Sequence, residues 1–284
     1  KNSEDAEKDF TLNFSAYTKT NDTVTIDAAV TAFSEIGTLR KKDPIDGVAI
    51  EAAYEGELQD LVKEMDAENG LTLDSDISTA VEDIKNDSSP KLAAQVIDKT
   101  LQRVFYLAVL ERITDVRDDF DDLDTSKLSL SWDEAYAAYQ PLVGTADREN
   151  KVLTADRTKI ETGSNPNLED QITVAFIRGQ KALDKKNPKE DEITIGVQRQ
   201  VIRLSLVRAF YIAVLREVEG VLNNRDSNPE KALENQKEGE VYYKIIEEFV
   251  SRDNSTGNET IKSQLTGELS DVGADTIVSE LSKG

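Results

Sequence analysis

Cysteine and histidine are both absent from the 284 residues of this chain. Without thiols there can be no disulfide, no thiolate metal site and no thiol nucleophile. Without imidazole there is no serine or cysteine triad that uses histidine and no histidine metal ligand. Most familiar enzyme and zinc chemistries are therefore excluded, and the sequence predicts that the protein is not an enzyme.

Long apolar runs are absent as well, since no stretch approaches the about 18 uninterrupted apolar residues that a membrane-spanning helix needs. The sequence therefore predicts no membrane span. The chain opens with KNSEDAEKDF, without a methionine, which favours a processed, exported protein with a polar leader and a lipid tether at its N-terminus. We expect an extracytoplasmic, secreted protein in the periplasm or at the cell surface.

Charge is strongly one-sided, with 56 acidic against 34 basic residues and a formal net charge of −22 at pH 7. Such a surface repels nucleic-acid phosphates and anionic membranes, and it gathers cations. Nucleic acid is therefore excluded as a partner, and a metal ion is favoured. Solubility in a salty environment is an alternative explanation for the same acidity, and the composition does not choose between the two.

What the chain does contain is a repeated segment. VIDKTLQRVFYLAVLERITDV at 96–116 returns as VIRLSLVRAFYIAVLREVEGV at 201–221, with identical residues at ten of 21 positions. The apolar residues follow the spacing of one helix face, and neither copy contains a glycine or proline before Gly220. Each copy is predicted to form a buried helix.

The similarity continues on both sides of these helices. The matching pairs are 132–150 with 238–254 and 76–87 with 171–187. The sequence therefore predicts an all-α protein, a helical bundle of two tandem repeats of about 105 residues related by a pseudo-twofold axis. The repeats are 45–150 and 151–256. They are predicted to form a single domain in which the two central helices pack on each other.

The chain outside the repeats divides into two parts. Residues 1–44 are a leader with the first elements, and alternation within 10–30 predicts a short β-hairpin, although its alanine-rich end favours helix. Residues 257–284 are predicted to form a C-terminal helix. Ser131 and Asp133 precede an apolar run and predict that a helix starts there.

Oxygen atoms are the ligands left to a chain without thiol and imidazole, and carboxylate and phenolate oxygens suit hard cations. In each repeat an acid lies at the far end of the central helix, Glu111 in the first and Glu217 in the second. The next helix carries an acid followed two residues later by a tyrosine. These pairs are Glu134 with Tyr136 and Glu240 with Tyr242.

These six side chains would form a metal site if the second helix folds back along the central helix, as in the carboxylate sites of helical bundles. The alternative is structural. Glu134 and Glu240 would then favour the positive end of a helix dipole, and Tyr136 and Tyr242 would be half-buried core residues.

The central helix with an acid near its end, followed by a linker and by DEAYAAY at 133–139, is duplicated as a unit. This order resembles the iron-assimilation (Fea-type) periplasmic proteins of green algae and related haloarchaeal lipoproteins. The resemblance implies an exported, all-α, non-enzymatic protein that binds iron, as Fe³⁺ or Fe²⁺, for uptake. It implies Glu134 and Glu240 as ligands, joined by Glu111 and Glu217.

An acidic segment at 115–134, DVRDDFDDLDTSKLSLSWDE, holds eight acids in twenty residues. Positions 1, 3, 5 and 12 of a calcium-binding loop are matched by Asp122, Asp124, Ser126 and Asp133. This match makes Ca²⁺ the alternative ion. Lys127 stands where the loop requires glycine, however, and a solvated acidic linker is the simpler explanation.

Arg103 and Arg208 are the only charged residues identical in both central helices. A cation on a mostly apolar helix needs a partner, because an unpaired buried charge is costly. The simpler role is an ion pair with an acid of the same repeat. The alternative is that these arginines hold a ligand carboxylate or an anion beside a metal.

Together these patterns predict an extracytoplasmic protein that binds iron through carboxylate and tyrosine oxygens for uptake. A surface binding or scaffold module without a metal is the alternative. A hydrolase with paired carboxylates is a third reading. It is disfavoured because no such pair is fixed by the sequence and because Trp132 is the only tryptophan that could stack on a sugar.

Overall fold

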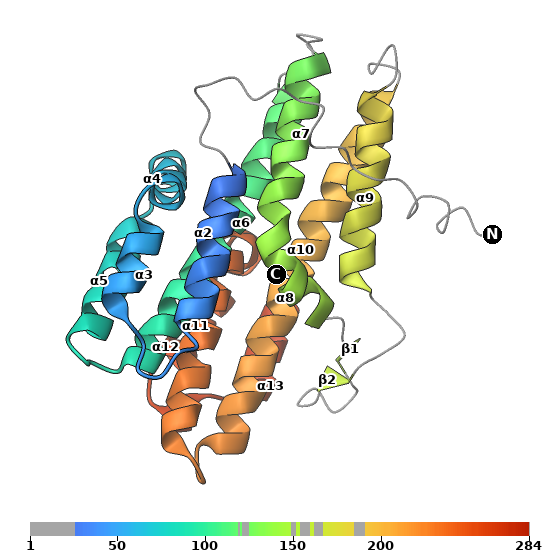
Figure 1. The fold of residues 1–284 in the computed structure, drawn as a ribbon. Coiled ribbons are helices and arrows are strands. Elements are labelled where there is room, and N and C mark those ends of the chain that lie inside the picture. Colours follow the sequence, from blue (N-terminus) through green and yellow to red (C-terminus); the bar gives the residue numbers. More distant parts are fainter. Residues whose placement is uncertain are drawn as a thin grey trace.

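Helices make up almost all of the described chain, so the predicted all-α class is confirmed (Figure 1). The structure is a computed structural model that describes residues 26–118, 120, 125–148, 152–153, 160–161, 167–184 and 191–283. Its first elements are α2 (Ile26–Leu39), α3 (Gly47–Tyr54), α4 (Glu57–Asn69), α5 (Leu73–Lys85), α6 (Pro90–Asp118), α7 (Thr125–Tyr139), η3 (Gln140–Leu142) and α8 (Val143–Arg148). The later elements are β1 (Val152–Leu153), β2 (Ile160–Glu161), α9 (Leu168–Leu183), α10 (Glu192–Asn224), α11 (Pro229–Asp253), α12 (Ser255–Thr266), η5 (Leu269–Asp271) and α13 (Ala274–Leu281).

The order of the helices agrees with the duplication seen in the sequence. The central segment at 96–116 lies in α6 and its copy at 201–221 lies in α10. In each half a shorter helix, α5 or α9, precedes the central helix, and α7 or α11 follows it. The pseudo-twofold axis and the single domain stay predictions.

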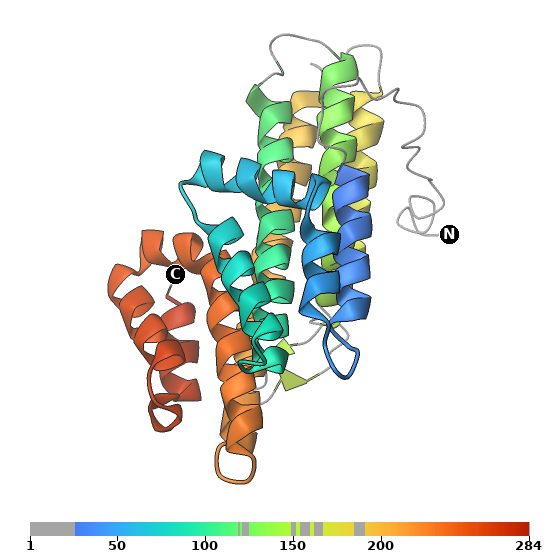
Figure 2. The ribbon, with the colours of Figure 1, turned by 60° about the vertical axis from the view of Figure 1, so that its left-hand side comes forward.

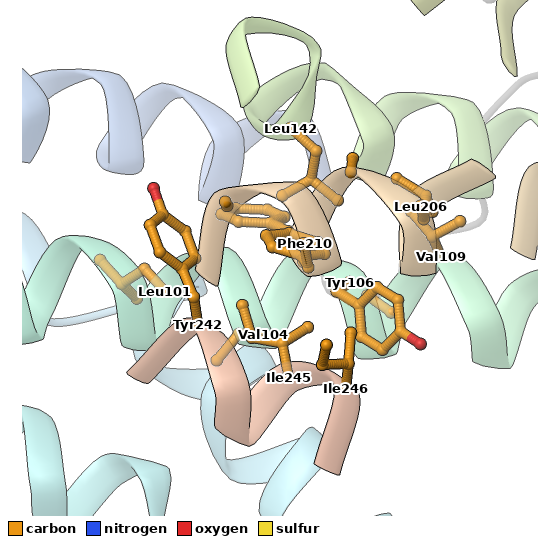
Figure 3. Close-up of a cluster of buried hydrophobic side chains, with 14 of the residues drawn as sticks. Leu101, Val104, Tyr106, Val109, Leu142, Leu206, Phe210, Tyr242, Ile245 and Ile246 are labelled. Atoms are coloured by element: carbon orange, nitrogen blue, oxygen red, sulfur yellow. The ribbon is translucent and has the colours of Figure 1, made fainter. Parts of the chain in front are cut away.

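The two central helices meet at one point rather than along their length. There the rings of Tyr106 and Phe210 contact each other edge to face, with centroids 5.6 Å apart. In the second half, α6 packs more extensively against α11 than against α10. Figure 3 shows Leu101 and Val104 of α6 beside Ile245 of α11 in this shared core.

A second contact between the halves joins α7 to α9. The indole nitrogen of Trp132 donates a hydrogen bond to the carbonyl of Phe176 over 2.9 Å, and the two rings pack edge to face. A side chain at Gly179 would lie 2.0 Å from the Trp132 ring, so glycine permits this close approach. Trp132 is fully buried.

Shorter helices cover the long ones. Figure 2 shows α4 lying across the upright helices, and α12 with α13 on the outer side of α11. The turn between α4 and α5 is fixed by Gly70, which adopts a left-handed conformation, and by Asp66, which accepts hydrogen bonds from the first amides of α5. None of the helices within the described residues is both long and apolar enough to cross a membrane.

Two local predictions need correction, and a third is tested only in part. The C-terminal segment forms two helices, α12 and α13, because Gly267 and Gly273 interrupt it. Helix α7 begins at Thr125 rather than at Ser131 or Asp133. Of the predicted hairpin, residues 10–25 lie outside the described residues and the alanine-rich end belongs to α2. The described strands are β1 and β2, two residues each, paired antiparallel.

Candidate functional site

Two of the expected metal ligands, Glu111 and Glu134, meet at a guanidinium. Arg112 of α6 donates to Glu134 over 2.9 Å and forms an ion pair with Glu111 at 3.2 Å. It also donates to Glu64 of α4 over 2.7 Å, and Asp115 lies 3.9 Å away. Burial raises the pKa of both Glu111 and Glu134, although Arg112 acts against that rise. We call these five residues the Arg112 cluster.

Glu217 of α10 lies apart from that cluster and is 1% exposed. It accepts a hydrogen bond from Asn235 of α11 over 2.7 Å and pairs with Arg216 at 2.7 Å. Burial, and then the charge of Glu238, raise the pKa of Glu217. Its neighbours are therefore an amide, a cation and a second acid.

Glu240 of α11 is bracketed by two lysines one turn away on either side. Lys237 lies 2.7 Å and Lys244 2.8 Å from its carboxylate oxygens. Although burial acts to raise it, hydrogen bonds from both ammonium groups hold the pKa of Glu240 below its ordinary value. The local charge of this trio is positive.

The two tyrosines are core residues. Tyr136 packs against Phe176 with ring centroids 5.2 Å apart, and Tyr242 is fully buried beside Phe210. The hydroxyl of Tyr242 accepts a hydrogen bond from Arg148 of α8 over 3.0 Å. Lys99 lies 5.1 Å from the centre of its ring. The structural alternative given for these tyrosines agrees with this packing.

The six expected ligands thus lie at separate places, and the part of the chain that the structure describes contains no group of three acids positioned to hold a metal ion. Each of the four carboxylates already has a cationic partner from the chain. The sequence itself indicates this pairing. The acid at the end of each central helix is next to an arginine, as Glu111–Arg112 in the first copy and Arg216–Glu217 in the second.

The residues of the calcium-loop pattern that the structure describes do not form a loop. Residues 125–133 are helical in α7, so Asp133 lies two turns inside a helix, whereas a calcium-binding loop requires these positions to surround the ion. Asp122 and Asp124 lie outside the described residues. Asp133 is 5% exposed, and neither of its carboxylate oxygens has a hydrogen-bond partner in the part of the chain that the structure describes. Burial, with a smaller effect of Asp184, raises its pKa to about 7.

Arg103 differs from the cations that pair with the expected metal ligands. Its side chain is partly buried on α6, yet within the described residues it has neither a hydrogen bond nor an ion pair. Burial lowers the pKa of the guanidinium, while the charges of Glu247 and Asp76 act against that fall from beyond ion-pair distance. The expected ion pair is therefore wrong for Arg103. Its counterpart Arg208 is exposed on α10.

Two cavities meet at Arg103, between α6 and α11. The first, of about 420 Å³, is also lined by Tyr106, and we call it the Tyr106 cavity. The second, of about 390 Å³, is also lined by Thr100, and we call it the Thr100 cavity. Lys244 lines both. Together they form a groove between the two halves, which we call the α6–α11 groove.

The walls of the Tyr106 cavity combine apolar and charged groups. Its floor holds Leu107, Leu110 and the ring of Phe249. Phe249 lies between two guanidinium groups, Arg203 at 5.6 Å and Arg252 at 5.2 Å from its ring centre. Figure 3 shows that the hydroxyl of Tyr106 points away from the buried cluster. An apolar floor with a few charged groups is typical of small-ligand sites.

Comparisons with protein-family models, with curated proteins and with solved structures find no match for this chain. The resemblance to the Fea-type family is therefore not tested by a relative. The function must be argued from the geometry of the site alone.

Proposed function

We propose that this protein is a non-catalytic binding protein whose ligand lies in the α6–α11 groove and presents a carboxylate to Arg103. The observation that supports it most is a partly buried guanidinium, at the junction of two cavities, that has no partner among the described residues. Keeping such a charge unpaired costs stability, and function is the usual reason for that cost. A carboxylate accepts two hydrogen bonds from one guanidinium, which makes it the natural partner.

The charge around the groove supports an anionic group as well. The whole chain has a net charge of −22, so most of its surface repels anions. The Thr100 cavity nevertheless gathers Arg103, Lys237 and Lys244 against Asp76 and Asp83. Lys237 and Lys244 pair with Glu240, so Arg103 is the cation that a ligand carboxylate would meet there. The low dielectric of a partly enclosed cavity would strengthen that pairing.

Hexanoate tests this proposal because it carries one carboxylate and a short apolar tail. We expect hexanoate to shift the backbone amide resonances around Leu107 and Ile245 on binding. Hexanamide at the same ionic strength should bind with an affinity at least about tenfold lower. Arg103→Gln should weaken hexanoate binding about tenfold or more. Arg208→Gln is the matched control, because it removes the equivalent arginine of the other repeat from an exposed position.

Equal binding of hexanoate to the wild type and to Arg103→Gln would overturn the proposal. Arg103→Gln should remain folded, since it removes an unpaired charge rather than a partner. Circular dichroism checks this. If the variant unfolds, Arg103→Lys provides a second measurement, since it keeps the charge and loses the bidentate geometry.

The iron hypothesis remains a prediction, and it predicts a different experimental result from the groove proposal. If iron binds through Glu134 and Glu240, Fe³⁺ should raise the melting temperature of the wild type, and replacing either acid by alanine should abolish the rise. The geometry gives this hypothesis less support than the groove, because both acids are already paired with arginine or lysine. The extracytoplasmic location likewise remains an expectation.

A further inference from the structure

We infer that the ligand of the Tyr106 cavity is a short peptide with free termini, bound in an extended conformation with its carboxylate at Arg103 and its amino group at Glu68 and Glu111. This inference rests on the proposed function and goes further, because it assigns both ends of the ligand. It follows from the charges at the two ends of the cavity, from its length and from its floor.

The end of the Tyr106 cavity opposite Arg103 carries two carboxylates. Glu68 of α4 and Glu111 of α6 both line it, and Glu68 has no ion pair within the described residues. Glu111 shares Arg112 with Glu64 and Glu134, so one guanidinium pairs with three carboxylates. Among the described residues the buried Oε2 atom of Glu111 has no hydrogen-bond partner. A primary ammonium group is the chemical complement of this end.

Three charged residues do not follow this simple division. Arg203 of α10 lines the cavity and lies 5.6 Å from the centre of the Phe249 ring, and its guanidinium donates to Gln200 over 3.4 Å. Arg252 lines the cavity near the end that carries the two carboxylates, but it pairs with Asp253 at 3.1 Å and stacks on Phe249. Glu248 lies one turn beyond Lys244 on α11 and contributes to the field at Arg103 without pairing with it. Within the described residues none of the three forms an ion pair with Arg103, Glu68 or Glu111, so these groups stay available to the two ends of a ligand.

The distance between the two ends selects the length of the ligand. Arg103 and Glu111 are eight residues apart on α6, which corresponds to about 12 Å along the helix axis. An extended chain of three residues spans about 10 to 11 Å and one of four about 13 to 14 Å. A cavity of about 420 Å³ has room for a peptide of this size with small or medium side chains.

The apolar residues between the two ends of the cavity favour a peptide with an apolar side chain. Leu107 and Leu110 lie between Arg103 and Glu111 on α6, and Ile245 and Phe249 face them from α11. An apolar side chain in the middle of the peptide would be removed from water there, which favours binding. Capture of free peptide termini by charged groups is a known mode of peptide recognition.

The experiment compares Ala-Leu-Ala with its N-acetylated and its C-amidated forms by calorimetric titration. For the wild type we expect the free tripeptide to bind and each blocked form to bind at least about tenfold more weakly. In Arg103→Gln the amidated and free forms should bind equally. In a Glu68→Gln, Glu111→Gln double variant the acetylated and free forms should bind equally. Arg208→Gln should behave as the wild type.

The outcomes separate this inference from the proposed function. If acetylation leaves binding to the wild type unchanged while amidation weakens it, the carboxylate site at Arg103 stands and the amino-group assignment is wrong. If the tripeptide does not bind at all while hexanoate binds at Arg103, only the peptide inference fails. If neither binds, the proposed function fails with it.

Discussion

The guanidinium of Arg112 lies among acids at a position where a hard metal cation was expected. Its guanidinium contacts Glu64 and Glu134 through two hydrogen bonds and lies within ion-pair distance of Glu111 and Asp115. Carboxylates gathered without any cation would repel one another strongly. An arginine therefore makes the same convergence of acids stable without a metal, and it leaves those acids with fewer free oxygens for one.

Replacing Arg112 tests this view of the cluster. We expect Arg112→Ala to lower the free energy of unfolding at pH 7 by about 3 kcal/mol, because three or more partly buried carboxylates lose their counter-charge. Calcium at millimolar concentration should then raise the stability of the variant more than that of the wild type, since the released oxygens suit a hard cation. Urea unfolding with and without calcium measures both effects.

Arg117→Ala is the control for that experiment. Arg117 lies on the same helix and pairs with Asp118 at 2.5 Å, but both side chains are more than half exposed. An exposed pair contributes little, so its loss should change stability by less than about 1 kcal/mol. A calcium effect of equal size in both variants would show that the response comes from net charge alone.

Asp133 makes stability depend on pH. Its pKa is 3.8 ordinarily and about 7 in the folded chain, so between these values the folded state binds a proton that the unfolded state has released. The contribution of Asp133 is therefore fully present below about pH 4 and is lost as the pH rises to about 7. We expect the free energy of unfolding to fall by about 2 to 4 kcal/mol over this interval.

Asp133→Asn should remove most of this fall and should stabilise the protein at pH 8. Urea unfolding at intervals between pH 4 and pH 8 measures the slope. Asp184→Asn is the comparison, because burial raises the pKa of Asp184 in the same direction while that side chain lies at an exposed helix end. An Asp133→Asn profile that retains the full slope would contradict this assignment.

At the scale of elements, the sequence predicts what depends on local pattern. The repeated apolar spacing at 96–116 and 201–221 correctly predicts two long buried helices, because that spacing places one face against a core. The predicted start of α7 is wrong because Thr125 is followed by a less apolar turn. Ser131 and Asp133 are therefore the stronger local signals for a helix start. The break between α12 and α13 has a local signal in Gly267 and Gly273, because glycine lowers helix propensity.

The candidate site is less predictable than the helices because it depends on how they pack. Whether Glu134 faces a metal or Arg112 is decided by the rotation of α7 against α6, which no local pattern contains. Arg103 could be recognised as unusual from its repetition. That it has no partner, whereas Arg208 is exposed, follows only from the position of α11 beside α6.

The contact of α7 with α9 can be tested at Gly179. A methyl group there would lie 2.0 Å from the buried Trp132 ring, far inside normal contact, so we expect Gly179→Ala to lower the free energy of unfolding by about 2 to 3 kcal/mol. Gly196→Ala on α10 is the matched control. Nothing lies within 4 Å of its added methyl group, and helix propensity should stabilise it by about 0.5 to 1 kcal/mol. Equal effects of the two changes on urea unfolding would contradict the packing argument.

At the scale of the whole molecule, buried polar contacts connect the halves. Lys99 of α6 pairs with Asp98 at 2.6 Å and with Glu238 of α11 at 3.6 Å. Asp98 also pairs with Arg40, which follows α2. Such buried charges lose much of their compensation if the halves separate, because their partners lie on different elements. The halves should therefore depend on each other for stability.

Trp132 offers a direct test of that dependence, because the only tryptophan of the chain lies on α7 and donates its hydrogen bond to Phe176 of α9. Its fluorescence therefore reports the contact between the halves, whereas circular dichroism reports the helices of both. If the halves fold as one domain, both signals should change in a single urea transition with the same midpoint. If the contact through Trp132 and Lys99 were weak, fluorescence would change first and the helical signal would persist to higher urea. In that case the α6–α11 groove would open before either half unfolded, and a tripeptide bound across it should move the first transition and leave the second in place.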